Sequence, residues 1–417
     1  MTPEVSRGRL WAIGAAIAAV HLVLFALLPL LPITSDSVGY DEIALSVARG
    51  EPWLLNGESQ VAWMPGYPSF VGLVYLVFGH RPAVVFAIQA LLVGVDAVLM
   101  FVLARRLLGA RPALVAMAWV GLTPVLVAYQ GILASESLAL PLVLGLLEAM
   151  TRPVPATLRG QARWAMWVGF LGGALCFTRA DYVLWMLGVP ALLWRAVPWK
   201  RVVGLTAVAA TVTLLWLAPW VVRNARAHGE IIPFTAISGR TFWMGAQQPE
   251  ETEYGSSGYV AAERRCEAEN PRRPAARDAC MNRDGWRIAA THPVYFGEHV
   301  FVRIARTLFS SNTDYLPGFQ VSFGQARAQG LYGVLALKAL LLLAHVLLAV
   351  LALVGFVRRR REFFWLMLGL MLASKLAIHG IVFGTGRYAV PFLPVLLLGA
   401  LAAFWPPRPL APLAEPS

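Results

Sequence analysis

Long apolar runs follow one another along most of the chain, with short polar segments between them. The region 164–194 holds two shorter runs, which Thr178-Arg-Ala-Asp181 separates. A transmembrane helix needs about 20 residues, so the apolar run 67–79 is too short to cross a bilayer. The pattern predicts an all-α polytopic membrane protein with about ten transmembrane helices. Besides the two in 164–194, the predicted spans are the apolar runs 10–32, 83–104, 112–129, 132–150, 202–222, 331–356, 363–383 and 388–405.

The positions of the basic residues predict how the spans are oriented across the membrane. The chain has 417 residues, 58% of them hydrophobic, and a formal net charge of +12. Its cations stand in short clusters between the spans, which is the positive-inside pattern and argues against nucleic acid as a partner. With the N-terminus inside and 67–79 as a helix on the outer face, every basic cluster falls inside. The prediction is a multi-pass protein of the plasma or inner membrane whose loops 33–82 and 223–330 are extracytoplasmic.

The same topology divides the chain. Residues 1–222 form an N-terminal transmembrane module that includes a first outer loop, 33–82. Residues 223–330 form a large extracytoplasmic loop, long enough to be functional or a folded insertion. Residues 331–405 hold the C-terminal spans, and the Pro-rich segment 406–417 is predicted to be a disordered tail.

The large outer loop contains two of the three cysteines, Cys266 and Cys280. If this loop faces an oxidising compartment, the two can form a disulfide. Cys176 lies in an apolar span, where a cysteine usually serves as a small core residue.

The first outer loop begins with a predicted amphipathic helix on the membrane surface. Tyr40, Ala44 and Val47 fall on one helical face, while Asp41 and Glu42 fall on others. This helix brings carboxylates to the outer surface, within reach of a lipid headgroup.

Five motifs occur in order along the chain. They are Asp36 followed by Tyr40 and Ala44, then Pro65-Gly-Tyr-Pro68, Glu136 within Ala134–Pro141, Trp220 to Pro249 with its Arg223-Asn224 pair, and Gly386-Arg-Tyr-Ala-Val-Pro-Phe-Leu-Pro394. In their order and spacing they resemble the bacterial polyprenyl-phosphate-sugar glycosyltransferases of family 39 and the dolichyl-phosphate-mannose-protein mannosyltransferase type. The resemblance implies the C-type glycosyltransferase fold.

The chain departs from better-known relatives before the second motif. Lipid A aminoarabinose transferases have an acid and a lysine there, and protein mannosyltransferases have His-Pro-Pro. This chain has Ala62-Trp-Met-Pro65. The acceptor of either subgroup therefore does not carry over.

The resemblance implies transfer of a sugar from a polyprenyl-phosphate carrier to an acceptor hydroxyl. The hydroxyl must lose a proton as it attacks the anomeric carbon, and Asp36 is the predicted base. Asp41 and Glu42 are candidates to position the acceptor, and Asp36 and Glu42 are candidates to hold a divalent cation, the one cofactor considered. A single displacement would invert the anomeric centre.

The leaving phosphate gains charge as the glycosidic bond breaks, so fixed cations beside it would stabilise the transition state. Arg223 and Arg387 stand at outer ends of spans, and Lys375 and His379, one turn apart on the span before Arg387, are further candidates. The remaining candidates for donor or acceptor contact are Tyr40, Tyr67, Glu136, Asn224 and Tyr388.

Several alternatives stay open. Asp36 can simply cap its helix, and Arg223 can extend to lipid headgroups from the membrane boundary. As a whole, the chain can be a lipid or glycan transporter or flippase, or a catalytically inactive scaffold of the same fold. A transporter would place polar groups at mid-membrane in broken, repeated helices. The sequence shows no repeat, and its Gly and Pro interruptions gather near the outer surface.

Overall fold

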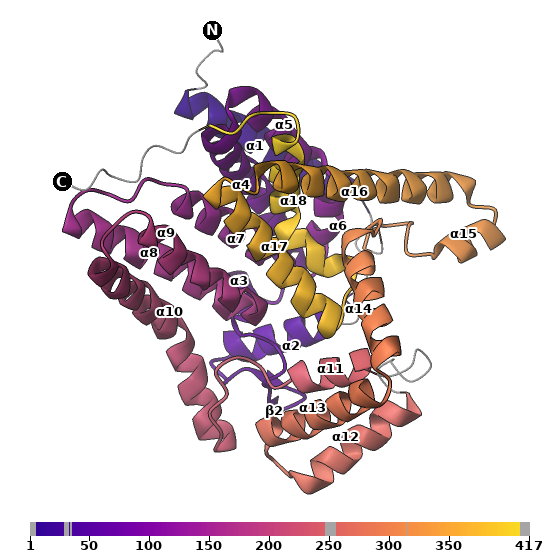
Figure 1. The fold of residues 1–417 in the computed structure, drawn as a ribbon. Helices are drawn as coiled ribbons and strands as arrows, with labels where there is room; N and C mark the ends of the chain where they lie inside the picture. Colours follow the sequence, from indigo (N-terminus) through magenta and orange to yellow (C-terminus); the bar gives the residue numbers. More distant parts are fainter. Residues whose placement is uncertain (1–5, 29–32, 34–35, 247–255, 314, 409–417) are drawn as a thin grey trace.

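The computed structural model describes residues 6–28, 33, 36–246, 256–313 and 315–408 (Figure 1). Within these residues, five helices are long and apolar enough to cross a membrane. They are α1 (Arg7–Leu27), α4 (Pro82–Leu108), α10 (Trp199–His228), α16 (Tyr332–Arg359) and α17 (Phe363–Ile381). The predicted all-α membrane class is confirmed.

Other predicted spans are helices that are short or interrupted. Helices α5 (Ala110–Leu122) and α6 (Pro124–Gln130) bend by 44° at Thr123 and together make a sixth candidate. Pro124, which cannot donate its backbone nitrogen, accounts for the break. A count of about ten spans is therefore not confirmed by length and composition.

The remaining predicted spans are helices that do not meet the length and composition of a membrane span. They correspond to α7 (Glu136–Met150), α8 (Leu158–Thr178), η1 (Ala180–Leu187), α9 (Gly188–Trp194), η3 (Gly386–Phe392) and α18 (Leu393–Ala402). The break between α8 and η1 falls at Arg179, where the sequence predicts an interruption. Two functional segments, at Arg179 and at Gly386, thus coincide with places where regular helix stops.

Helix α4 is the centre of the packing. It contacts α1, α5 and α7, and its residues contribute to the largest hydrophobic core. A methyl group placed on Gly94 would lie 2.4 Å from the carbonyl oxygen of Gly14, so glycine allows α1 and α4 to approach backbone to backbone.

The first outer loop forms α2 (Asp36–Ala48), a hairpin of β1 (Leu54–Leu55) and β2 (Glu58–Ser59), and α3 (Gly66–Phe78). Asn56 and Gly57 have positive φ, as a two-residue hairpin turn requires. Tyr40 and Ala44 are buried against α3, on the face that the sequence predicts, whereas Val47 is only half-buried.

The large outer segment is helical too. Helices α11 (Ser238–Ala246), α12 (Ser257–Glu269) and α13 (Pro274–Thr291) lie together at one end of the molecule (Figure 1). The Asp278 carboxylate accepts the backbone N–H groups of Gly239 and Arg240 at the start of α11, and so fixes α13 against it. Helices α14 (Pro293–Leu308) and α15 (Phe323–Ala328) connect this group to α16.

Cys266 of α12 and Cys280 of α13 form a disulfide. The Pro-rich tail lies mostly outside the described residues, from 409 onward.

Candidate active site

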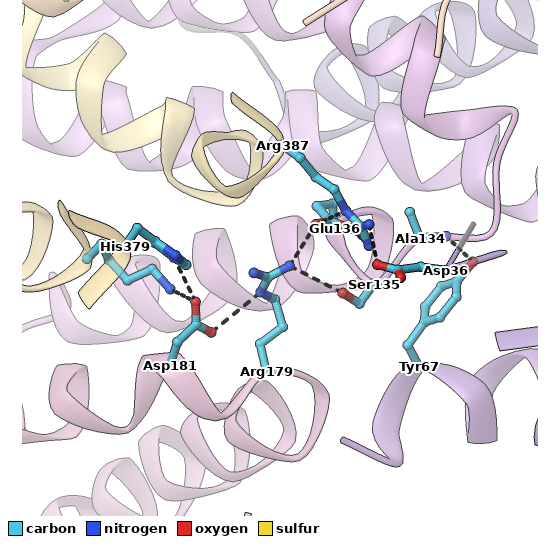
Figure 2. Close-up of polar contacts among 10 residues, drawn as sticks. Asp36, Tyr67, Ala134, Ser135, Glu136, Arg179, Asp181, His379 and Arg387 are labelled. Carbon is cyan, nitrogen blue, oxygen red and sulfur yellow. Dashed lines mark hydrogen bonds and ion pairs between the residues drawn. The ribbon is translucent and has the colours of Figure 1, made fainter. Parts of the chain in front are cut away.

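Acidic and basic side chains alternate in one continuous network at the ends of several helices (Figure 2). In order, the network joins Asp36, Arg387, Glu136, Arg179, Asp181 and the pair Lys375 and His379. These residues come from α2, η3, α7, the α8–η1 break, η1 and α17. The fold thus gathers charges that stand up to 351 positions apart in the chain.

Glu136 is the centre of the network. Its Oε1 accepts hydrogen bonds from Arg387 Nε and from Arg179 Nη1, both at 2.8 Å. Its Oε2 accepts a hydrogen bond from Arg387 Nη2 at 3.3 Å. Its side chain is 0% exposed. A buried carboxylate is costly unless it is paired, and here the two guanidinium groups offset that cost.

Asp181, with its partners Lys375 and His379, lies at the end of the network opposite Asp36. Its Oδ1 lies 3.5 Å from Arg179 Nε, and its Oδ2 contacts Lys375 Nζ and, at 3.1 Å, His379 Nε2. The Lys375 side chain is fully buried, with its Nζ 3.6 Å from the centre of the Tyr182 ring. Lys375 is therefore committed to Asp181 and is not exposed for a ligand.

Asp36 is the open end. Its Oδ2 accepts a hydrogen bond from Arg387 Nη1 at 2.6 Å, and its side chain is 42% exposed. Among the residues that the structure describes, none donates a hydrogen bond to its Oδ1. The other members of the network have side chains that are at most 17% exposed, so Asp36, which Arg387 orients, is its most exposed member.

Aromatic rings cover this network. Tyr388 stacks on His379 with ring centres 4.4 Å apart, and the Arg179 guanidinium lies 5.4 Å from the centre of the Tyr388 ring. Burial raises the pKa of Tyr40 to about 12, so its hydroxyl stays protonated at neutral pH.

Tyr67 differs from the sequence prediction. Its ring is fully buried, its hydroxyl donates to Gln89 Oε1 at 2.7 Å, and the same hydroxyl accepts the Ala134 N–H at 2.9 Å. Gln89 Nε2 in turn donates to the carbonyls of Gln130 and Ile132. The structure uses Tyr67 to hold the loop that leads into Glu136, and no face of its ring is open for a sugar.

Asp41 and Glu42 also have other partners. Asp41 accepts the Tyr75 hydroxyl and lies 3.0 Å from His80 Nε2, while Glu42 Oε1 accepts the backbone N–H of Asn56. Both carboxylates tie α2 to the rest of the first outer loop. The helical turn that directs Asp36 and Tyr40 toward the network directs these two elsewhere.

Arg223 and Asn224 hold the same loop from the end of α10. Arg223 donates to the carbonyl oxygens of Pro52, Trp53 and Gln60, between 2.6 and 3.1 Å. Asn224 Nδ2 donates to the carbonyl of Ile232 at 3.0 Å. Both residues therefore bind backbone carbonyls. A sequence pattern cannot distinguish this role from phosphate binding, because carbonyl and phosphate oxygens both accept hydrogen bonds from arginine.

The donor set does not fit a cation shared by Asp36 and Glu42. Arg387 already neutralises Asp36, and Glu42 is bound to Asn56. Within the described part of the chain, the one group of His, Cys, Asp or Glu atoms close enough to hold a metal is Cys266, Cys280 and Asp284. Its two sulfur atoms are joined to each other in the disulfide.

Sequence reasoning understated the roles of Arg179, Asp181, Ser135 and Gln89. The sequence marks Arg179 and Asp181 only as part of the segment that separates two apolar runs, yet they carry the network from Glu136 to Lys375. The sequence signal for their role is that two opposite charges, Arg179 and Asp181, interrupt an apolar run two residues apart. Nothing in the sequence pattern distinguishes Ser135 or Gln89.

The fold is that of the C-type membrane glycosyltransferases. It is similar to the oligosaccharyltransferase of Archaeoglobus fulgidus solved with zinc and sulfate, with a TM-score of 0.52 and 15% identity over 94% of this chain. The same enzyme tethered to an acceptor peptide containing the NVT sequon gives a TM-score of 0.50 at 14% identity, over 94% of this chain. In both cases this chain covers 48% of the archaeal enzyme.

Residues 63–222 match the family model of the dolichyl-phosphate-mannose-protein mannosyltransferases. The resemblance predicted from the motifs is thereby confirmed for this part of the chain. No curated protein sequence matches the chain significantly.

A further likeness is to ArnT from Cupriavidus metallidurans bound to undecaprenyl phosphate. Its TM-score is 0.44 at 18% identity, and the match covers 94% of this chain and 77% of ArnT.

Proposed function

We propose that this protein transfers a hexose or pentose from a polyprenyl-phosphate carrier to an acceptor hydroxyl on the extracytoplasmic side of the plasma or inner membrane. The observation that carries the proposal is the state of Asp36. It is the exposed end of a buried, charge-paired network, and one of its oxygens is held while the other is free to take a proton.

Asp36 is the general base in this proposal. The acceptor hydroxyl binds beside Oδ1 and loses its proton to it while the hydroxyl oxygen attacks the anomeric carbon. Arg387 fixes the carboxylate through Oδ2 and, through Glu136, is itself fixed. A positioned base of this kind contributes about 10²–10⁴-fold to a rate.

The carrier phosphate is the leaving group. As the bond from the anomeric carbon to the phosphate oxygen breaks, negative charge grows on the phosphate, and a fixed cation nearby stabilises it. Attack by the acceptor from the opposite side inverts the anomeric centre in one step. Arg387 supports this step by holding positive charge beside the reacting groups without having to reorganise.

The disulfide supports an extracytoplasmic site, because disulfides persist in oxidising compartments. The segment that carries it and the loop that carries Asp36 lie on the same side of the molecule. The backbone N–H of Ala236 donates to the carbonyl of Val61 at 2.8 Å, and that of Ala275 donates to Glu230 at 2.9 Å. One continuous outer layer therefore joins α2, the hairpin and α13.

Reconstitution tests the reaction. The full-length protein in lipid nanodiscs would receive a panel of polyprenyl-phosphate sugars together with acceptor fractions of the cell envelope. We expect release of free polyprenyl phosphate and a glycosylated product whose anomeric configuration, by NMR, is opposite to that of the donor. Turnover of nucleotide sugars alone, or movement of the lipid across the bilayer without cleavage, would contradict the proposal.

A further inference from the structure

A carboxylate lies near the middle of α4 without a hydrogen-bond donor. Asp96 is 2% exposed, and its Oδ1 has no hydrogen-bond partner among the residues that the structure describes. An ionised carboxylate inside a membrane helix is costly unless a partner or a polar cavity compensates its charge. Asp96 lies outside the charged network of the candidate active site, so that network does not supply the partner.

A small cavity adjoins Asp96 where α4, α6 and α7 contact one another. Its volume is about 10 Å³, which is room for one particle of the size of a water molecule. No lysine, arginine or histidine lines this cavity in the described part of the chain. Oxygen-bearing side chains line it instead, namely those of Gln89, Asp96, Tyr129, Gln130, Glu136 and Ser137.

The side-chain amides that line the cavity have partners elsewhere. Gln89 Nε2 donates to the carbonyl oxygens of Gln130 and Ile132, both at 2.9 Å. Gln130 Nε2 donates to the carbonyl oxygen of His21 at 3.3 Å. Neither amide donates a hydrogen bond to Asp96, so these neighbours leave its negative charge uncompensated.

Other oxygen atoms of the lining can serve as ligands. Ser137 Oγ donates its proton to the carbonyl oxygen of Tyr129 at 3.1 Å, and the lone pairs of this hydroxyl can therefore face a cation. Helix α6 ends at Gln130, and the carbonyl oxygens in the last turn of a helix carry partial negative charge. Carboxylate, hydroxyl and carbonyl oxygens together are the ligands that hard cations prefer.

Helix α6 also ends inside the bundle. It is separated from α5 by a bend of 44°, and its last residue, Gln130, is 3% exposed. In membrane proteins, a discontinuous helix whose C-terminal end lies beside a buried carboxylate is a common way to bind a sodium ion or a proton. A protonated carboxyl group needs only one acceptor, whereas this cavity offers room for an ion and several oxygen atoms around it.

From this arrangement we infer that the cavity between α4, α6 and α7 binds one sodium ion, held by the Asp96 carboxylate, the Ser137 hydroxyl and carbonyl oxygens at the end of α6. Charge favours a monovalent ion, because Glu136 is already paired with two arginines and Asp96 contributes the one uncompensated negative charge. The small volume favours sodium over the larger potassium ion. The ion fixes the end of α6 against the first turn of α7, which carries Glu136.

Thermal unfolding of the full-length protein in nanodiscs, in sodium chloride or choline chloride at equal ionic strength, tests the inference. Sodium at about ten times its Kd should raise the Tm of the wild-type protein by about 2–4 °C, because the ion binds the folded state alone. Potassium should raise Tm less. Asp96→Asn should abolish the sodium-dependent rise, and Ser137→Ala should shift it to a higher sodium concentration. Radioactive sodium should bind to the wild-type protein and not to Asp96→Asn.

Two comparisons separate loss of the ion from loss of the fold. In choline chloride, Asp96→Asn should be at least as stable as the wild-type protein, because the amide removes an uncompensated charge from the bilayer. Glu148→Gln is the matched control, since it removes a buried carboxylate that two arginines already neutralise. It should retain the full sodium-dependent rise, whatever its own Tm.

Three results would overturn the inference. The first is an equal Tm of the wild-type protein in sodium and in choline. The second is an undiminished sodium-dependent rise in Asp96→Asn, which would place the ion elsewhere. The third is a rise that acid reproduces in choline while no radioactive sodium binds, which would show a proton on Asp96 in place of the ion. These measurements use neither donor nor acceptor, so their outcome is independent of the proposed function.

Discussion

At the residue scale, Glu136 connects the two arginines of the site. The sequence suggested it for contact with the donor or acceptor, whereas the structure buries it between Arg179 and Arg387. Resemblance to a family can indicate that an acid stands at this position. It cannot indicate that the acid pairs with residues 43 and 251 positions away, because that depends on how three helices end at the same point.

Glu136→Gln should therefore reduce both stability and activity. The variant leaves Arg179 and Arg387 each with one carboxylate partner in place of two, so the loss of stability should be smaller than the roughly 3–5 kcal/mol of a buried charge left wholly unpaired. Thermal unfolding and donor turnover would both be measured in nanodiscs. We expect a lower Tm and a loss of turnover, because Arg387 no longer holds Asp36 in place.

Glu148→Gln is the control for this variant. Glu148 lies on the same helix, pairs with Arg106 and Arg152, and has a side chain that is 7% exposed. It should lower Tm without a specific loss of turnover in the folded fraction. An equal effect of the two variants on turnover would contradict a special role for Glu136.

Local partners explain the residues that the sequence misplaced. Asp41 and Glu42 look free on a helical projection, yet Tyr75 and Asn56 reach them from elements that follow in the chain. Tyr67 lies in a motif, but its ring is the support of the loop before Glu136. Such contacts depend on how α2, α3 and the hairpin pack on one another. The periodicity of apolar positions carries no information about that packing.

At the element scale, the apolar pattern predicted the helices of the bundle and located the break at Arg179, but it predicted none of the helices α11 to α15 in the large outer segment. It did not determine how many helices span a membrane, because α7 has 15 residues and η3 with α18 is interrupted by a change of helix type. Polar breaks near Arg179 and Gly386 shorten the regular helix there and bring charged side chains together. Counting spans by length undercounts such segments.

The disulfide is the element-scale feature that gives a direct prediction. It joins α12 and α13 across 14 positions, and closing a loop of about 15 residues stabilises a fold by about 3 kcal/mol in the chain-entropy account. The double variant Cys266→Ser, Cys280→Ser should make residues 256–291 more sensitive to limited proteolysis while Asp36 and its network stay intact.

Thiol labelling provides the control for that experiment. Cys176 is buried and free, so denatured, non-reduced wild-type protein should label at this one cysteine. Labelling of all three cysteines would contradict the disulfide and would remove one argument for an extracytoplasmic outer layer.

At the scale of the whole molecule, composition and charge clusters were enough to predict the class, and motif order was enough to predict the family. Neither could show that the charges form one alternating network with a single exposed carboxylate. That network depends on packing between the N-terminal module and the C-terminal helices, which contribute Glu136 and Arg387 respectively. The site is therefore a property of the assembled bundle.

The measurement that tests this account most directly is single-turnover sugar transfer by Asp36→Asn in membranes charged with the donor lipid. Asp41→Asn serves as the matched control, because it changes the same group on the same helix outside the network. We predict that Asp36→Asn slows transfer by about 10²–10⁴-fold while carrier binding and Asp41→Asn stay near wild type. Wild-type transfer by Asp36→Asn would contradict the account.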